Sequence, residues 1–298
     1  MNHSLSILVA EPGSTGDYAL LDSGGGRKLE RFGAVTVDRP EPQAMWQPKL
    51  PQSNWAKADG VFDGGDGDDD KGKWKHRGAA AEQWPMTIGG VTALCKFASF
   101  RHIGVFAEQA PHWTWMTEQL KSTPAPPRVL NLFGYTGLAS LIAAKNGAEV
   151  THVDASKTAV RWARDNQAES GLADAPIRWI VDDARKFAAR EVRRAKTYHG
   201  LIVDPPKFGR GPEGEVWDLF EHLPALLTDC AKLIDPNNGF LVLTAYAIRA
   251  SALAIDALAR EVLAGLGGAF EAGELAIREQ SAGRLLPTSL YVRWTRHG

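Results

Sequence analysis

The fold is decided by the stretch Val129-Leu130-Asn131-Leu132-Phe133-Gly134-Tyr135-Thr136-Gly137. A mainly apolar run leads into a turn with two glycines, and a helix-favouring segment follows from Leu138, so the pattern predicts a strand, a tight turn and a helix. In doubly wound α/β sheets, a turn of this kind brings backbone N–H groups close to a nucleoside cofactor. The stretch therefore predicts a mostly parallel α/β sheet with a cofactor site at the carboxyl ends of its strands.

Asp154 closes the next apolar run, residues 150–154, and lies 20 residues after Gly134. In this class of fold, an acidic residue at the end of the second strand accepts hydrogen bonds from ribose hydroxyls. Asp154 is alternatively the N-cap of the following helix, with Ser156 as a competing cap. Only Gly134 and Gly137 stand where a pyrophosphate cradle requires three glycines, so the spacing disfavours a dinucleotide.

A third predicted strand, residues 177–181, ends in Asp182-Asp183-Ala184. Because the carboxyl ends of parallel strands open into one crevice, Asp183 is expected to accept a hydrogen bond from an adenine amine. The Ala184 N–H is expected to donate one to the adenine ring. Helix capping is the alternative for this acidic pair, and for Asp182 it is the preferred interpretation.

Asp204-Pro205-Pro206-Lys207-Phe208 follows a fourth predicted strand, residues 200–203. Two consecutive prolines remove two amide donors and fix an extended turn, so we expect the carbonyls of Asp204 and Pro205 to face outward. Such acceptors suit a nitrogen of a planar substrate, and Phe208 offers a ring for stacking. The candidate catalytic residues are Asp204, Pro205, Pro206 and Phe208.

From about residue 100 to the C-terminus, these motifs resemble class I S-adenosylmethionine-dependent methyltransferases. The resemblance is to the bacterial group around the 23S rRNA large-subunit methyltransferases, which have N-L-F-x-Y-T-G and D-P-P-K-F. It implies a Rossmann-like fold with a seven-stranded, mostly parallel sheet, S-adenosylmethionine as the methyl donor and ribosomal RNA as a partner. The element Gly104-Val105-Phe106-Ala107-Glu108-Gln109 is similar to the family's G-x-[FY]-x-[DE]-Q-R, with Ala110 in place of the Arg. The candidate cofactor-binding residues are Phe106, Glu108, Gln109, Asn131, Phe133, Gly134, Tyr135, Thr136, Gly137, Asp154, Ala155, Ser156, Asp183, Ala184 and Asp204.

The cysteines bear on the reaction. Relatives that methylate carbon 5 of cytosine need a Cys nucleophile after the fifth strand, and residues 243–247 contain none. Cys95 and Cys230 are interpreted as small core residues. Direct displacement onto a nitrogen, which already has a lone pair, is therefore preferred. The alternatives are a protein or small-molecule acceptor and, from other classes, a nicotinamide-dependent oxidoreductase or a non-catalytic nucleotide-binding protein.

The charge of the chain is balanced, with 34 Lys and Arg against 35 Asp and Glu and a net charge of −1. RNA binding would therefore depend on local patches. The best candidate is the basic run on the helix after Asp183, where Lys186, Arg190 and Arg193 share a face; a solvated helix surface is the alternative. With two cysteines and no recognisable signal or membrane segment, we expect a soluble cytoplasmic protein.

The first hundred residues are built differently. A glycine turn divides residues 18–32 into two apolar runs, as in a hairpin, and further strands are predicted at 35–37, around Trp74 and within 86–97. We expect a small, mostly β domain at residues 1–100 and a methyltransferase domain at 101–298. The acidic run 63–72 lacks the Gly and Glu of an EF-hand loop, so we interpret it as a flexible turn and expect no metal. In the second domain, helices are expected at 138–146, 157–170, 185–196, 219–233 and 251–266, a fifth strand at 239–244, and closing strands at 270–277 and 289–294.

Overall fold

The computed structural model describes residues 4–64, 72–77, 82–123, 126–246 and 248–296. The chain divides into two compact units, each built from segments that are distant in sequence. Unit 1 comprises residues 1–8, 112–275 and 288–298, and unit 2 comprises residues 9–111 and 276–287. From the sequence we expected one boundary, after residue 100. The observed division differs, because residues 276–287 belong to unit 2 and residues 1–8 belong to unit 1.

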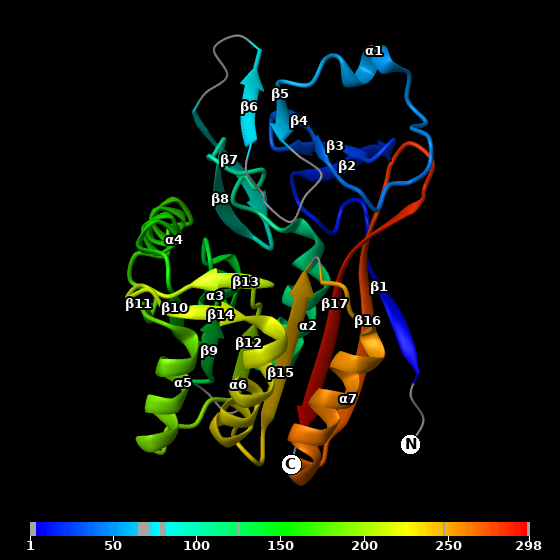
Figure 1. The fold of residues 1–298 in the computed structure, drawn as a ribbon. Coiled ribbons are helices and arrows are strands. Elements are labelled where there is room, and N and C mark those ends of the chain that lie inside the picture. Colours follow the sequence, from blue (N-terminus) through cyan, green and yellow to red (C-terminus); the bar gives the residue numbers. More distant parts are fainter. Residues whose placement is uncertain (1–3, 65–71, 78–81, 124–125, 247, 297–298) are drawn as a thin grey trace. The chain divides into compact units, whose positions relative to one another are not determined.

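An eight-stranded sheet forms the centre of unit 1 (Figure 1). Its strands are β1 (Leu5–Ala10), β9 (Arg128–Leu132), β10 (Glu149–Asp154), β11 (Ile177–Val181), β12 (Gly200–Val203), β15 (Gly239–Tyr246), β16 (Ala269–Arg278) and β17 (Leu285–Arg296). They are ordered β1-β16-β17-β15-β12-β9-β10-β11, and the last five are parallel to one another. The mostly parallel α/β sheet is confirmed. It has one strand more than the seven expected, because β1 adds to the edge beside β16.

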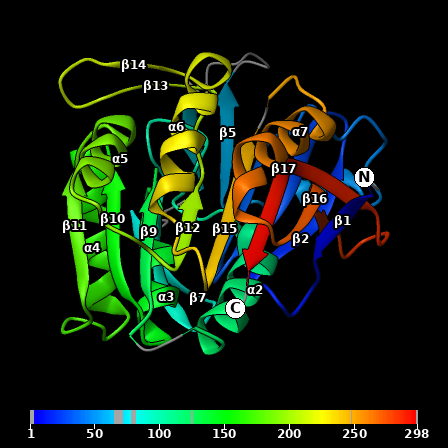
Figure 2. The ribbon, with the colours of Figure 1, turned by 90° about the horizontal axis from the view of Figure 1, so that it is seen from below.

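Helices cover both faces of this sheet. They are α2 (Ala110–Lys121), α3 (Leu138–Lys145), α4 (Lys157–Glu169), α5 (Ala184–Arg193), α6 (Leu219–Leu233) and α7 (Ala252–Leu263). Figure 2 shows α2 and α3 on one side of the sheet and α5, α6 and α7 on the other. The five helices expected after residue 137 are all present. Helix α2 was not predicted. Pro111 and the aromatic and β-branched residues 113–115 give this segment a weak intrinsic helix propensity, so the sequence carries little signal for it.

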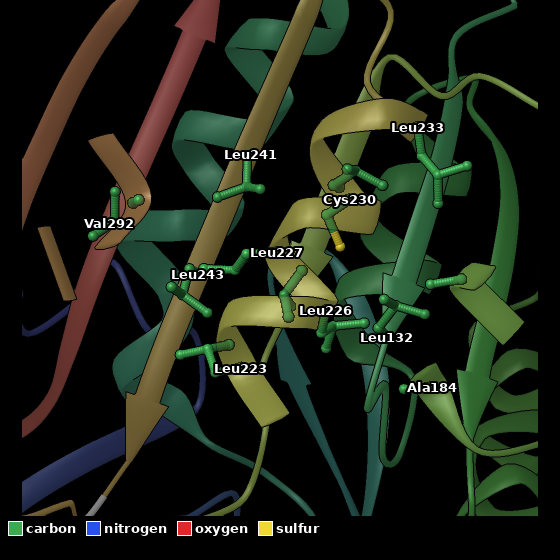
Figure 3. Close-up of a cluster of buried hydrophobic side chains, with 14 of the residues drawn as sticks. Leu132, Ala184, Leu223, Leu226, Leu227, Cys230, Leu233, Leu241, Leu243 and Val292 are labelled. Carbon is green, nitrogen blue, oxygen red and sulfur yellow. The ribbon is translucent and has the colours of Figure 1, made fainter. Parts of the chain in front are cut away.

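The core on the α6 side of the sheet is built by periodic spacing. Leu223, Leu226, Leu227, Cys230 and Leu233 recur every three or four residues, so one face of α6 is apolar and packs against the sheet (Figure 3). The Cys230 thiol lies among these leucines, and burial raises its pKa to about 12. Cys230 is therefore a core residue, as expected.

Unit 2 is mostly β, as expected. Its five-stranded sheet contains β2 (Tyr18–Gly24), β3 (Arg27–Phe32), β4 (Val35–Pro40), β5 (Gly60–Gly64) and β6 (Gly72–His76), and its two-stranded hairpin contains β7 (Gln83–Ile88) and β8 (Val91–Lys96). A short helix, α1 (Gln52–Trp55), precedes β5. The run 86–97 includes a hairpin turn, because Gly89 and Gly90 adopt φ values of +58° and +75° that match a two-residue primed turn. Residues 65–71 of the acidic run lie outside the described residues.

No helix in the described part of the chain is long and apolar enough to cross a membrane.

The second cysteine, Cys95 in β8, is also buried, and burial raises its pKa to about 12. Both thiols are therefore held in the neutral, unreactive form.

His112 in α2 gives the fold a pH dependence. Arg293 Nε donates a 2.8 Å hydrogen bond to Nδ1 of the buried His112 ring, which must be neutral to accept it. Burial, and secondly the charge of Arg293, hold the pKa of His112 well below its usual value. The free energy of unfolding should therefore fall as the pH drops below the unfolded-state pKa of about 6.5.

Urea unfolding of the wild type and of His112→Asn at pH 8 and pH 5 checks this expectation. The Asn side chain keeps an oxygen acceptor near the position of Nδ1 and does not titrate. The variant should therefore lose less stability on acidification than the wild type, and equal losses would contradict the assignment.

Candidate active site

The turn after β9 has strained backbone geometry. Phe133 and Tyr135 adopt φ values of +59° and +48°, and Gly137 adopts +82°. Left-handed conformations at residues other than glycine cost about 1–3 kcal/mol each and persist only where the surrounding structure holds them. They concentrate at functional sites, so this turn is the first part of the candidate site.

Three backbone donors of the turn are bonded within the protein. Gly134 N–H donates to the Val153 carbonyl at 3.0 Å, and Gly137 N–H donates to the Gly134 carbonyl at 2.9 Å. Tyr135 N–H donates to Asp154 Oδ2 at 2.8 Å. These three amides are therefore not free to hold phosphate groups.

Asp154 is fixed between two loops at the end of β10. Its Oδ2 accepts the Tyr135 N–H, and its Oδ1 accepts the Ser156 N–H at 2.8 Å. Burial raises the pKa of Asp154, against the opposing effect of these two hydrogen bonds. Each oxygen retains acceptor capacity for a further donor, which suits the two adjacent hydroxyls of a ribose. The alternative role of Asp154 as a helix cap is wrong, because Ser156 Oγ accepts the Ala159 N–H and caps α4.

At the end of β11, the acidic residue that caps the following helix is not the one expected. Asp183 caps α5, since its Oδ1 accepts the N–H groups of Arg185 and Lys186 at 2.9 and 3.0 Å. Asp182 forms an ion pair with Arg190 at 2.5 Å instead. The interpretation of Asp182 as the cap is therefore wrong. The contact of Asp183 and Ala184 with adenine stays a prediction.

Val181 is a residue of this edge that the sequence interpretation did not single out. It ends β11 directly opposite Asp154 of β10 and is 36% exposed. An exposed apolar side chain beside a hydrogen-bonding carboxylate suits a nucleoside, which presents an apolar base next to a polar sugar. Its position at the end of an apolar strand, before the acidic pair, was the available signal.

The turn after β12 is held by a hairpin that was not predicted, β13 (Phe208–Arg210) and β14 (Val216–Asp218). Trp217 Nε1 donates to the Pro206 carbonyl at 2.6 Å, and Leu219 N–H donates to the Lys207 carbonyl at 3.0 Å. Among the contacts of the described residues, none donates to the carbonyl of Pro205, which is a buried residue. The sequence signal for the hairpin is Gly211-Pro212-Glu213-Gly214 between the two short strands.

Asp204 and Phe208 border this turn. Asp204 is half-buried, and its N–H lies 3.4 Å from the Leu132 carbonyl, next to the first turn. The Phe208 ring is 57% exposed, with the Lys207 ammonium 5.3 Å from its centroid. An exposed aromatic ring in the same segment as a half-buried carboxylate suits a planar acceptor.

Trp217 joins the two turns and was not foreseen as a site residue. It is buried, and its ring lies 4.9 Å from that of Phe133, centroid to centroid. The same indole donates to the Pro206 carbonyl. Phe133 is thus in contact with the wall of the Asp204–Phe208 turn.

Other residues of the expected cofactor site have partners within the protein. Asn131 is buried beneath the first turn, where its Nδ2 donates to Ser140 Oγ at 2.9 Å. Thr136 is buried within the turn, and its carbonyl accepts the Asn166 Nδ2 at 2.9 Å. Phe106, Glu108 and Gln109 belong to unit 2, in or next to a short 3₁₀ helix, Ala107–Gln109, and burial raises the pKa of Glu108. Their part in the cofactor site, and that of Ala155, stays a prediction. The described residues contain no group of three His, Cys, Asp or Glu side chains arranged to hold a metal.

A family model described as S-adenosylmethionine-dependent methyltransferase matches residues 55–265, which is more than half of the chain. This chain belongs to that family. It is therefore a methyltransferase that uses S-adenosylmethionine as its methyl donor, as the motifs implied.

Two solved structures support the fold. The SAM-dependent methyltransferase from Agrobacterium tumefaciens is 48% identical, with a TM-score of 0.92, and the match covers 99% of this chain and 97% of that one. SMU.776 complexed with SAH is 17% identical, with a TM-score of 0.71, covering 94% of this chain and 76% of the other. At that identity, the second likeness concerns the fold alone.

A curated relative has a named substrate. Ribosomal RNA large subunit methyltransferase K/L of Shewanella frigidimarina is 37% identical over 115 residues. The match covers 38% of this chain and 16% of that protein. The chain thus spans only a small part of this relative.

The site fits S-adenosylmethionine on the geometry of this chain. The cofactor has a ribose diol but no phosphate, which agrees with a turn in which three amides are occupied and with a carboxylate that retains acceptor capacity. Asp154 would hold the ribose, and Val181 would lie against the adenine.

Asp154→Ala should weaken S-adenosylmethionine binding by about 1.5–3 kcal/mol, or tenfold to a hundredfold in Kd, because it removes a charge-assisted bond and releases the Tyr135 N–H. Isothermal calorimetry measures this. Glu149→Ala, at the opposite end of β10, is the matched control and should bind normally. An unchanged Kd for Asp154→Ala would mean that the cofactor binds elsewhere.

Proposed function

We propose that this methyltransferase acts on a nucleobase nitrogen of RNA, with ribosomal RNA as the substrate class. The observation that carries the proposal is the exposed Phe208 ring and the half-buried Asp204, which lie in the same short segment after β12. The ribosomal RNA substrate named for the K/L relative supports the choice of RNA. A protein or small-molecule acceptor is the alternative, since the fold accommodates both.

The residues of the second turn would orient the acceptor. Phe208 would stack on the base, and the Pro205 carbonyl would accept a hydrogen bond from an exocyclic amino group. Asp204 would accept the proton that an exocyclic amine loses on methylation. Bound S-adenosylmethionine supplies the electrophilic methyl group. Most of the rate acceleration would then come from holding the nitrogen lone pair in line with that methyl group.

The cysteines support nitrogen rather than cytosine carbon 5 as the target. Carbon 5 becomes nucleophilic only after a thiolate adds to the ring. Cys95 and Cys230 are both fully buried, and burial raises the pKa of each to about 12. A thiolate from either residue is therefore strongly disfavoured.

Cys95→Ala and Cys230→Ala should each retain full turnover, with a stability loss of about 1 kcal/mol from the small cavity left in the core. Methyl transfer to the identified acceptor and thermal unfolding are measured together. A variant that stays folded and loses activity would restore covalent carbon methylation.

The basic helix α5 gives little support to a broad phosphate-binding surface. Lys186 pairs with Glu213 and Glu215, and Arg194 pairs with Glu191. Arg190 is held by Asp182. Since these charges are neutralised within unit 1, RNA affinity would rest on few phosphate contacts and depend weakly on salt.

Labelled S-adenosylmethionine offered with total RNA, ribosomal subunits or protein extract from a strain lacking the gene tests the substrate class. We expect label in large-subunit ribosomal RNA. Asp204→Asn should reduce labelling at least about a hundredfold with an unchanged cofactor Kd, because it removes the proton acceptor. Glu261→Gln, an exposed carboxylate on α7, is the control. Label in protein alone would overturn the RNA proposal.

A further inference from the structure

One row of side chains, with the buried His152 at its centre, lies directly beneath the strained turn. Asn131 of β9, His152 of β10 and Trp179 of β11 stand opposite one another in the strand register. The rings of His152 and Trp179 are 4.6 Å apart, centroid to centroid. A methyl group built on Gly134 would overlap the His152 ring, and one built on Gly137 would come within 3.0 Å of Trp179. The turn therefore rests on this row without a gap.

Side-chain hydrogen bonds that connect β9, α3 and β10 fix the orientation of His152. Asn131 Nδ2 donates to Ser140 Oγ at 2.9 Å, and Ser140 Oγ lies 3.0 Å from His152 Nδ1. Ser140 Oγ thus links the Asn131 amide to the His152 ring, and its hydroxyl can pair with Nδ1 of the neutral ring in either tautomer. Burial lowers the pKa of His152 to about 3, so the ring stays neutral at physiological pH.

If His152 served only to pack the core, it would lower the stability of the protein relative to an apolar residue. Its Nε2 is fully buried and has no hydrogen-bond partner among the described residues. A buried polar atom without a partner costs about 1–3 kcal/mol, so an apolar side chain of similar size would give a more stable core. A polar ring kept at this cost indicates a role beyond packing.

The position of His152 in β10 identifies that role. Residues 152 and 154 face the same side of the strand, since successive side chains alternate. The turn thus contacts this side at two points, Gly134 on the His152 ring and Tyr135 on the Asp154 carboxylate. A shift of the ring would move Gly134 and pull the Tyr135 N–H away from Asp154.

We infer that His152, oriented by Ser140 and Asn131, is a positioning residue that holds the turn at residues 133–137 in its strained, cofactor-binding conformation. It touches neither the cofactor nor the acceptor and acts through Gly134 and Asp154. The inference rests on the cofactor site at Asp154 and is independent of the methyl acceptor.

Two variants of similar size separate positioning from packing. His152→Asn keeps an oxygen acceptor near the position of Nδ1 for the Ser140 hydroxyl, whereas His152→Leu removes it. We expect His152→Leu to raise the S-adenosylmethionine Kd about tenfold with an unchanged or higher melting temperature, and His152→Asn to restore most of the affinity. Ser140→Ala removes the hydroxyl that connects Asn131 to His152, and it should weaken S-adenosylmethionine binding several-fold. Thr151→Val, on the opposite face of β10, is the control.

Calorimetric titration and thermal unfolding are read side by side. Wild-type affinity in both His152→Leu and Ser140→Ala would overturn the inference, and so would losses that simply follow the loss of stability in every variant. Asp154→Ala distinguishes the causes of failure. If it loses affinity while His152→Leu does not, only the positioning role is wrong. If neither loses affinity, the cofactor site itself is misplaced.

Discussion

The hydrogen bond from Tyr135 N–H to Asp154 Oδ2 is the interaction on which the site depends. It holds a residue with a left-handed φ against the end of the neighbouring strand. Such a conformation costs about 1–3 kcal/mol, and a hydrogen bond to a carboxylate contributes about 1.5–3 kcal/mol, so the two nearly balance. Because the margin is small, the conformation of the turn and the position of the carboxylate are determined together. This coupling also explains why Asp154 is held by backbone amides of both loops.

The side chains at the carboxyl ends of β9, β10 and β11 form two layers, to which we assign different roles in the site. The upper layer, Asp154 and Val181, would supply an acceptor and apolar surface for a nucleoside without phosphates. The lower layer consists of the buried Asn131 and His152 and the half-buried Trp179, and it lies against the turn above it. The motifs placed Asn131 and Asp154 in one list of binding residues, since a motif records only sequence position. Burial separates them.

The sequence was sufficient wherever local chemistry decides the outcome. The parallel strands, the helices after residue 137 and the hairpin at residues 18–32 follow from apolar spacing and glycine turns. It was insufficient where two neighbours compete, as at Asp182 and Asp183, because the distant Arg190 decides which of them is free to cap α5. It was also insufficient where contacts span the chain. The addition of β1 to the sheet edge and the return of residues 276–287 to unit 2 leave no local signal.

Trp217, which the sequence analysis did not identify, shows how the two turns are held at a fixed separation. Its ring packs on Phe133, which belongs to the cofactor turn, and its Nε1 donates to the Pro206 carbonyl, which belongs to the acceptor turn. One buried indole thus links the two edges at which donor and acceptor would meet. In a displacement reaction, a misplacement of about 1 Å can cost about a hundredfold in rate. The separation of the two turns is therefore set by a rigid side chain in the core of unit 1, and it does not depend on the exposed hairpin loop between β13 and β14.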